Sequence, residues 1–136
     1  MDNDELETVV RAEMGLPPTP KPPSTFAAAL AAAQATMTNP VRDKENPHFK
    51  SRYTSLAAVR DAVVPVLAAH GIATILEPRT LDDGRLGVFC HLLWGEERHT
   101  FGPVAFGVDP RNPQVAGSAA PYGERYLLAA VGAVAA

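Results

Sequence analysis

The chain has 136 residues, 46% of them hydrophobic, which favours a single domain with its own apolar core. Its net charge of −3 and pI of about 5.7 exclude a protein that wraps nucleic acid by bulk positive charge, so phosphate binding would need a local cluster of Lys and Arg. One cysteine, Cys90, excludes an intrachain disulfide, residues 1–7 lack the apolar region of a secretory signal, and no apolar run could span a bilayer, so we expect a soluble intracellular protein.

Residues 1–24 are predicted to form a flexible, proline-rich tail. Five prolines fall within Leu16–Pro23, and such a run favours extended polyproline-type structure and cannot enter a helix or sheet core. Residues 5–14 are compatible with a short helix or a partner peptide. The predicted organisation is therefore a tail over residues 1–24 and a folded core over residues 25–136.

Two helices are expected at the start of the core. Ser24 or Thr25 can cap a helix that ends near Met37, before Asn39-Pro40. Ser55 can cap a second helix that stops at Gly71, and Pro65 should kink it. The apolar side chains that define one face of each helix are Phe26, Leu30, Ala33 and Met37 in the first, and Leu56, Val59, Val63, Val66 and Leu67 in the second.

Three strands of an antiparallel meander are predicted next. Ile72–Glu77 is short and β-branched, Asp83-Gly84 favours a hairpin turn, and Pro103 assigns the strand over residues 98–106 to an edge. In the strand between them, the side chains expected to face the core are Leu86, Val88, Cys90, Leu92 and Trp94. Phe89 and Leu93 make its other face apolar too, so we expect a helix or a neighbouring subunit to cover that face.

Residues 114–136 predict a final helix, which completes an α+β fold in which helices flank a three-stranded antiparallel meander. Gly117, Pro121 and Gly123 should weaken its first half. The helix ends in an apolar segment, residues 127–136, which suggests that a C-terminal tail is missing. Two sets of side chains are expected on different faces: Val115, Ala119, Tyr122, Tyr126 and Ala129 on one, and Gln114, Ser118 and Arg125 away from it.

Residues 39–60 carry the strongest functional signal. The charged side chains are Arg42, Lys44, Lys50, Arg52 and Arg60, against Asp43 and Glu45. Phe49 and Tyr53 are interleaved with them; cations neutralise phosphates, and aromatic faces stack on any base for roughly 1–3 kcal/mol each. In an extended segment Lys50 and Arg52 would project on one side, opposite the two aromatic rings. The alternative is a solvated loop that Phe49 and Tyr53 anchor to the core.

Other candidate sites are weaker. Arg125 in the last helix could reach a phosphate, or could be a surface arginine that pairs with Glu124 or a neighbour. The four histidines have no metal-ligand spacing, there is no phosphate-binding loop, and Cys90 is expected to be a buried core residue. The acid pairs at residues 82–83 and 96–97 are interpreted as solvated turns rather than as the metal ligands of a nuclease.

Two blocks resemble the ERF (essential recombination function) family of single-strand annealing proteins, over about residues 26–136. The first, Met37–Gly71, contains Asn-Pro-His-Phe-Lys-Ser-Arg-Tyr at residues 46–53, and the second, Gln114–Gly132, contains Arg125-Tyr126. The family commonly has Thr-Tyr-Ala-Arg-Arg-Tyr where this chain has Pro-Tyr-Gly-Glu-Arg-Tyr. Because Glu124 replaces an arginine, we expect phosphate affinity there to be weaker or to come from the first block.

The resemblance implies ATP-independent annealing of single-stranded DNA in homologous recombination, by a homo-oligomeric ring or helical filament, on a Red-beta-like core of a β-sheet backed by helices. It implies no cofactor and no membrane, and a phage- or prophage-encoded protein in the cytoplasm of a bacterial host. The partners it implies are single-stranded DNA, the annealed duplex intermediate, and a phage exonuclease or host single-strand-binding protein. The predicted DNA-binding residues are Lys44, His48, Phe49, Lys50, Arg52, Tyr53, Arg60, Gln114, Ser118 and Arg125.

Three other functions remain open at this point. A non-annealing single-strand binder would protect DNA and slow pairing, whereas an annealing protein would speed it. A metal-dependent nuclease would need a compact acidic cluster, which the sequence does not predict. An oligomeric scaffold would not bind DNA even at low salt.

Overall fold

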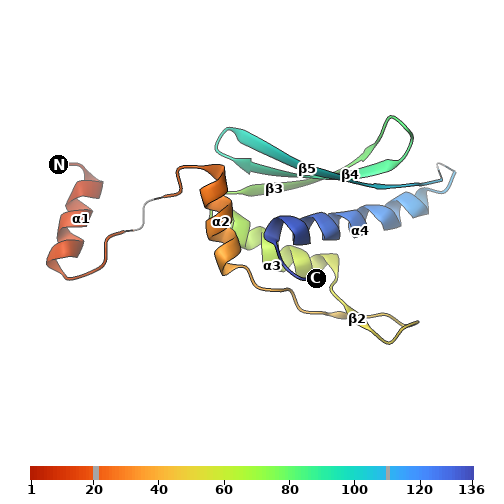
Figure 1. The fold of residues 1–136 in the computed structure, drawn as a ribbon, viewed down its shortest axis with the longest axis horizontal. Helices are drawn as coiled ribbons and strands as arrows, with labels where there is room; N and C mark the ends of the chain where they lie inside the picture. The colour runs from red at the N-terminus through yellow and green to blue at the C-terminus, as the bar shows by residue number, and fades with distance from the viewer. Residues whose placement is uncertain (20–21, 110) are drawn as a thin grey trace.

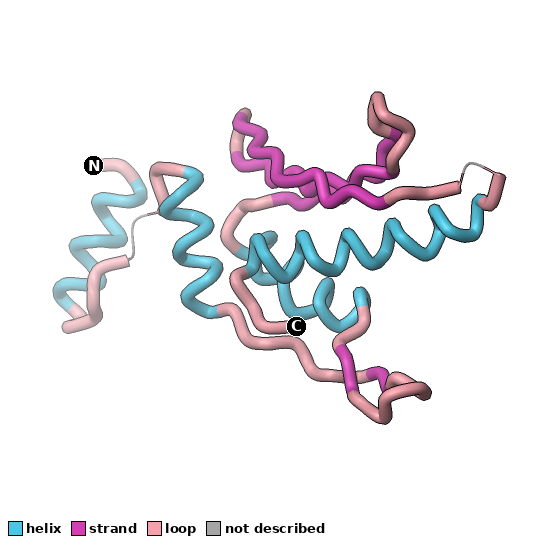
Figure 2. The backbone as a smooth tube through the Cα atoms, turned by 45° about the vertical axis from the view of Figure 1, so that its right-hand side comes forward, coloured by secondary structure: helices cyan, strands magenta, loops and turns pink. Residues whose placement is uncertain are grey.

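A computed structural model describes residues 1–19, 22–109 and 111–136 (Figure 1). The elements are α1 (Asn3–Glu13), α2 (Phe26–Thr36), β1 (Lys44–Glu45), β2 (Arg52–Tyr53), α3 (Leu56–Ala69), β3 (Ala73–Thr80), β4 (Leu86–Trp94), β5 (Glu97–Phe106) and α4 (Pro113–Gly132). Strands β3, β4 and β5 form an antiparallel sheet in that order, with α3 and α4 on one face and α2 packed on α3 (Figures 1 and 2). The α+β meander expected from the sequence is confirmed.

The core lies between the sheet and the helices. Its fully or almost fully buried side chains are Ala29 and Ala33 of α2; Val59, Val63 and Leu67 of α3; Ile72; Val88, Cys90 and Leu92 of β4; and Leu127, Leu128 and Val131 of α4. The apolar stripe predicted for α3 and the alternation predicted for β4 are therefore confirmed. Of the stripe predicted for α2 only Ala33 is buried; Phe26, Leu30 and Met37 pack partly buried against the core, and Ala29 is buried in addition. In the described parts of the chain, no helix combines the length and the hydropathy needed to cross a bilayer.

The ends of α3 follow its sequence signals. Ser55 caps the N-terminus through a 3.1 Å hydrogen bond from the Ala58 amide to its hydroxyl oxygen. At the C-terminus Gly71 has a φ of +78°, and its amide donates to the Ala68 carbonyl while the Ile72 amide donates to the Leu67 carbonyl. The helix runs through Pro65 without a break. The predicted start and stop of this helix are both confirmed.

Both outer strands of the sheet contain a proline that the edge position tolerates. Strand β3 continues to Thr80, three residues beyond its predicted end, and Pro78 lies opposite Val88. Pro103 lies in β5, the other outer strand, so its predicted edge position is confirmed. A proline has no amide hydrogen to donate, and an edge strand leaves one row of amides without a ladder partner, so an outer strand can contain a proline at little cost. Pro103 also falls where the register of β4 and β5 shifts, between the pairs Val88–Val104 and Cys90–Phe101.

The second face of the sheet carries no helix among the described residues, contrary to one of the two expectations for it (Figures 1 and 2). A polar network crosses its three strands: the His91 ring nitrogens lie 2.9 Å from Glu77 Oε1 and 2.9 Å from Thr100 Oγ1. The Arg79 guanidinium lies 4.3 Å from the centre of the Phe89 ring. These contacts partly shield the apolar side chains, and cover by a neighbouring subunit stays a prediction.

The N-terminal segment contains a helix, α1, at the position where residues 5–14 allowed one. Asp2 and Glu5 form a capping box at its start, and none of its residues is buried. Residues 20 and 21 of the predicted proline-rich stretch lie outside the described residues, and the flexibility of residues 1–24 stays a prediction.

Helix α4 is unbroken over 20 residues despite the glycines and proline expected to weaken it. A Cβ atom on Gly123 would lie 3.0 Å from Phe106 Cε2 and 3.0 Å from Val88 Cγ2. One on Gly132 would lie 2.9 Å from Val63 Cγ2. These two glycines therefore let α4 approach the sheet and α3 more closely than a side chain would permit.

Replacing Gly123 with alanine should destabilise the protein, because the added methyl group overlaps Phe106 and Val88. We expect the free energy of unfolding to fall by about 1–3 kcal/mol, the usual cost of overpacking. Gly117→Ala is the matched control, since nothing lies within 4 Å of the added Cβ; it should stabilise by up to about 1 kcal/mol through helix propensity. Urea denaturation measures both, and equal stability of the two variants would contradict the close-packing role.

Candidate nucleic-acid interface

Strands β1 and β2 form a short ribbon with a tight turn at its tip. Lys44 pairs with Tyr53 and Glu45 with Arg52. Asn46 organises the turn: its amide donates to the Ser51 carbonyl at 2.7 Å, and its side-chain oxygen accepts from the His48 amide at 2.9 Å. The cationic and aromatic segment, expected to be extended or a solvated loop, thus contains a short ribbon, and its turn is built by a local asparagine.

Asp43 attaches this ribbon to the start of α3. Its two carboxylate oxygens accept from the Ser55 amide at 2.8 Å and the Ser55 hydroxyl at 2.6 Å. The hydroxyl bond, and then the amide bond, lower the pKa of Asp43 below its ordinary value. The residue that caps α3 therefore also holds the base of the ribbon.

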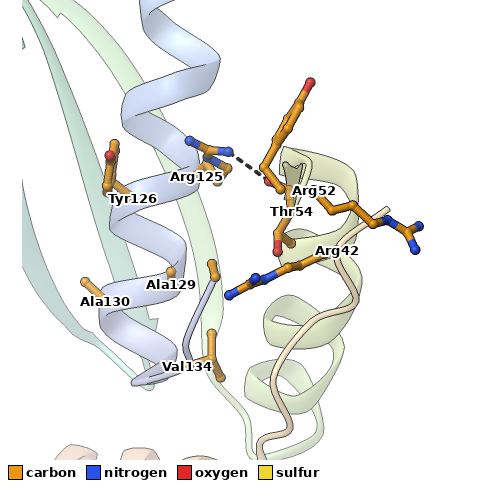
Figure 3. A pocket seen from close by; sticks show the side chains of 10 residues that line it. Arg42, Arg52, Thr54, Arg125, Tyr126, Ala129, Ala130 and Val134 are labelled. Atoms are coloured by element: carbon orange, nitrogen blue, oxygen red, sulfur yellow. Dashed lines mark hydrogen bonds between the residues drawn. The ribbon is translucent and has the colours of Figure 1, made fainter. Parts of the chain in front are cut away.

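Arg125 joins the ribbon to α4. Its guanidinium donates from Nη1 to the Thr54 carbonyl at 2.9 Å (Figure 3). The same group lies 5.0 Å, 5.6 Å and 5.7 Å from the ring centres of Tyr122, Tyr126 and Tyr53. One side chain of α4 thus fixes the end of β2 and gathers three aromatic rings around a positive charge.

Tyr122 and Tyr126 form an exposed aromatic pair on α4. Their rings pack edge to face with centres 4.7 Å apart, their hydroxyl oxygens lie 2.8 Å apart, and the residues are 47% and 51% exposed. The hydrogen bond to Tyr126 raises the pKa of Tyr122. Arg125 was expected away from the tyrosine face; it lies beside both rings because residues i, i+3 and i+4 share one helical face.

A groove runs along α4 beside the ribbon, and we call it the α4 groove. Its deepest part is a hollow of about 510 Å³, lined by Arg42, Arg52, Tyr53, Thr54, Arg125, Tyr126, Ala129, Ala130, Val134 and Ala136 (Figure 3). Hollows of about 470 Å³ and 250 Å³ share Tyr53, Tyr122 and Arg125. A fourth, of about 650 Å³, reaches Gln114 and Ser118 near the start of α4 and also contains Tyr122. Shared lining residues link each hollow to the next along α4, and we treat the four together as the α4 groove.

All the charged side chains that line the deepest hollow are positive. Three arginines line it and no aspartate or glutamate does. Within the described residues, the side chains of Arg42 and Arg52 form no hydrogen bond or ion pair, although Glu45 lies opposite Arg52 in the ribbon. The Thr54 hydroxyl, on a residue only 1% exposed, has no hydrogen-bond partner among the described residues. Anionic groups of a ligand would find arginine donors in this part of the groove and no aspartate or glutamate side chain in its lining.

The predicted site residues fall into three groups: those that line the α4 groove, those at the tip of the ribbon, and Arg60. Those that line the α4 groove are Lys44, Arg52, Tyr53, Gln114, Ser118 and Arg125. His48, Phe49 and Lys50 form the ribbon tip, and Phe49 is 79% exposed, so it does not anchor the ribbon to the core as the alternative required. Lys50 has a φ of +48°, so the backbone at the ribbon tip is not extended. The alternation of side chains expected over residues 49–53 therefore does not hold at Lys50.

Arg60 does not line the groove. It lies on α3 near Glu124, whose pKa is raised by burial and lowered in part by the Arg60 charge. Glu124 lines none of the four hollows, so the acidic replacement noted in the sequence lies outside the groove. The alternative of an Arg125–Glu124 pair is wrong, because Arg125 bonds the Thr54 carbonyl instead.

Sequence reasoning missed three groove residues: Arg42, Tyr122 and Tyr126. The tyrosines were grouped with apolar residues on a helical face, while the inward face of α4 is formed by Gly123, Leu127, Leu128 and Val131. The sequence did contain a signal for the tyrosines, because Tyr122 precedes Arg125 by three residues and Tyr126 follows it directly. Arg42 belongs to the cationic segment noted in the sequence but was not among the predicted DNA-binding residues; its place in the groove depends on its approach to the C-terminal segment.

Other candidate chemistry has structural explanations. Cys90 is buried, and burial raises the pKa of its thiol to about 11. Asp83 forms a 2.7 Å ion pair with Arg85 in the β3–β4 turn. Among residues 1–19, 22–109 and 111–136, no three or more His, Cys, Asp and Glu side chains gather to hold a metal ion.

Comparison with known proteins gives one match. A model of the ERF superfamily matches residues 26–136, which include the whole groove and exclude α1. No curated protein and no solved structure matches the chain.

Arg125→Lys should loosen the ribbon while keeping the charge. A lysine has no planar guanidinium to bond the Thr54 carbonyl while facing three rings, so we expect the free energy of unfolding to fall by about 1–2 kcal/mol. Urea denaturation measures this, and proteolysis within residues 43–54 should accelerate. Arg98→Lys, at an exposed position on β5, should change stability by less than about 0.5 kcal/mol. If the two variants lowered the free energy of unfolding equally, the contact of Arg125 with the ribbon would not stabilise the protein as proposed.

The base of the ribbon should also open in acid. The pKa of Asp43 is lowered in the folded state, so its contribution to stability is complete above the ordinary value of 3.8 and is lost as pH falls through the lower, folded-state pKa. Hydrogen exchange of residues 43–55, compared at each pH with Asp43→Asn, should show protection in the native protein that disappears in this window. If the native protein and Asp43→Asn showed the same protection from hydrogen exchange at every pH, the prediction would be wrong.

Proposed function

The chain belongs to the ERF superfamily, a family associated with DNA annealing in recombination, and from this premise we propose that it binds single-stranded DNA in the α4 groove and pairs complementary strands without ATP. The observation that carries the proposal is the composition of the groove. Uncompensated arginines and exposed tyrosines line the same continuous surface, and its deepest hollow contains no aspartate or glutamate. Such a surface suits a strand with anionic phosphates and flat bases.

In this proposal the arginines and tyrosines have separate tasks. Arg42 and Arg52 hold phosphates, which releases counterions and makes affinity fall with salt. Tyr53, Tyr122 and Tyr126 offer ring faces to bases; stacking is worth about 1–3 kcal/mol per base and does not depend on base identity. Arg125 is a positioning residue, because it organises the rings and the ribbon. Binding is therefore independent of sequence.

Annealing requires that the bound strand keeps the edges of its bases free. A strand held by its phosphates and by stacking keeps its hydrogen-bonding edges available, so a second strand can be tested by base pairing, and sequence specificity belongs to the DNA. The ribbon tip, with His48, Phe49 and Lys50 projecting into solvent, would contact the second strand or the next subunit. No covalent bond changes in this process, so we propose no enzymatic step and no cofactor.

Assembly would supply the affinity that a single groove lacks. Subunits side by side in a ring or helical filament would join several α4 grooves, each about 30 Å long for a 20-residue helix, and binding at linked sites multiplies. The proposed setting is phage or prophage recombination in a bacterial cytoplasm, with the annealed duplex as the product. A phage exonuclease that generates the strands, or a host single-strand-binding protein that coats them, is the partner this role requires.

The double variant Arg42→Gln/Arg52→Gln tests the groove. Each lost phosphate contact should reduce the salt dependence of oligothymidylate affinity by about 0.7 in the slope of log K against log salt. The same variant should lose acceleration of pairing between two complementary oligonucleotides. Arg98→Gln, an exposed arginine on β5 outside the groove, is the control and should behave as the native protein.

Two outcomes would count against the proposal. Unchanged salt dependence in the double variant would show that DNA does not use this groove. Tight binding by the native protein with slowed pairing would identify a protector of single strands rather than an annealing protein.

A further inference from the structure

The negative charge of the chain is concentrated outside the region that contains the groove. Residues 1–25 contain five acidic and two basic side chains, whereas residues 26–136 contain ten basic and ten acidic side chains. The net charge of −3 therefore belongs to the N-terminal segment, and the core is neutral. An acidic segment is thus tethered to a core with a locally basic groove.

Helix α1 has a face that needs a partner. It is a capped helix of 11 residues, and isolated helices of this length are marginal in water. Leu6, Val9 and Val10 lie at helical spacing and are 42–53% exposed, while acidic side chains occupy much of the remaining surface. A helix with this pattern gains stability by placing its apolar face against another surface, and its charge favours a basic one.

The α4 groove fits this helix better than the helix-free face of the sheet does. The groove combines exposed tyrosine rings with Arg42 and Arg52, which have no partners among the described residues. On the sheet, Arg79 already forms a 2.6 Å ion pair with Glu77 and covers Phe89. Uncompensated positive charge beside apolar surface is therefore found in the groove.

The tether is long enough. Residues 14–25 separate α1 from α2 and can span about 40 Å when extended. Helix α2 itself is only about 16 Å long, and Arg42 follows its last residue, Thr36, by six positions. The linker can therefore return past α2 and bring α1 to the groove of the same chain.

In the structure α1 lies beyond α2, away from α4 (Figure 1). We propose that α1 docks into the α4 groove of its own chain in a second arrangement and competes there with single-stranded DNA. The acidic side chains take the place of phosphates, and the apolar stripe packs on the tyrosines. DNA displaces α1 because it offers more phosphates and continues into neighbouring grooves. This regulatory role rests on the proposed function of the groove, and it makes binding selective for strands long enough to engage several subunits.

Removing charge from α1 should strengthen DNA binding. The full-length variant Asp4→Asn/Glu13→Gln leaves the capping box intact, and we expect oligothymidylate to bind about three- to tenfold more tightly at low salt, because tethering supplies millimolar effective concentrations of α1. The control Asp82→Asn/Glu96→Gln makes the same change in net charge in the sheet turns and should shift affinity less than twofold. The difference should vanish at high salt. Equal effects of the two variants would overturn the proposal.

Cysteine cross-linking tests docking without DNA binding as the readout, since the native Cys90 is buried. Val10→Cys/Ala130→Cys pairs α1 with an exposed groove position and should form an intrachain disulfide that oligothymidylate suppresses. Val10→Cys/Ile75→Cys pairs it with the helix-free sheet face and should not. A disulfide in the second variant only, a covalent dimer, or none in either would overturn the proposal. A groove disulfide in a protein that binds no DNA would instead refute the proposed function alone.

Discussion

The contact between Arg125 and the Thr54 carbonyl is the interaction on which the candidate site depends. It connects residues 71 positions apart, and it is the point where α4, the ribbon and three tyrosines meet. The ribbon has only two residue pairs, and isolated two-stranded ribbons are marginal even when longer. Its position is therefore set from outside, by Arg125 at one end and by Asp43 on Ser55 at its base.

Much of the fold could be predicted because burial leaves a periodic mark in the sequence. Val59, Val63 and Leu67 recur at helical spacing, and Val88, Cys90 and Leu92 alternate, so each pattern specifies its element and its inward face. Local polar residues were equally informative: Ser55 at a helix start and Gly71 at its end have the cap geometries their residue types favour. Such signals lie within a few residues of what they determine.

The groove was only partly predictable because it is made by segments distant in sequence. Tyr122 and Tyr126 match the helical spacing of a core face, yet the inward side of α4 is decided by Gly123 and Gly132, where close approach to β4 and α3 leaves no room for a side chain. The tyrosines are then turned outward, beside Arg125. Nothing local distinguishes Arg42 from the other cations of residues 39–60, and it belongs to the groove because the C-terminal segment passes next to it.

Net charge illustrates how a bulk property can mislead about a site. A value of −3 argues against binding by bulk charge, and the core indeed carries equal numbers of basic and acidic side chains. Within that neutral core the acids Asp43 and Glu77 are paired with hydrogen-bond donors, while Arg42 and Arg52 form no ion pair among the described residues and no aspartate or glutamate lines the deepest hollow. The affinity of this surface for anions is therefore set by which charges are left uncompensated. A tethered acidic helix can modulate that affinity because it acts on those few charges rather than on the total.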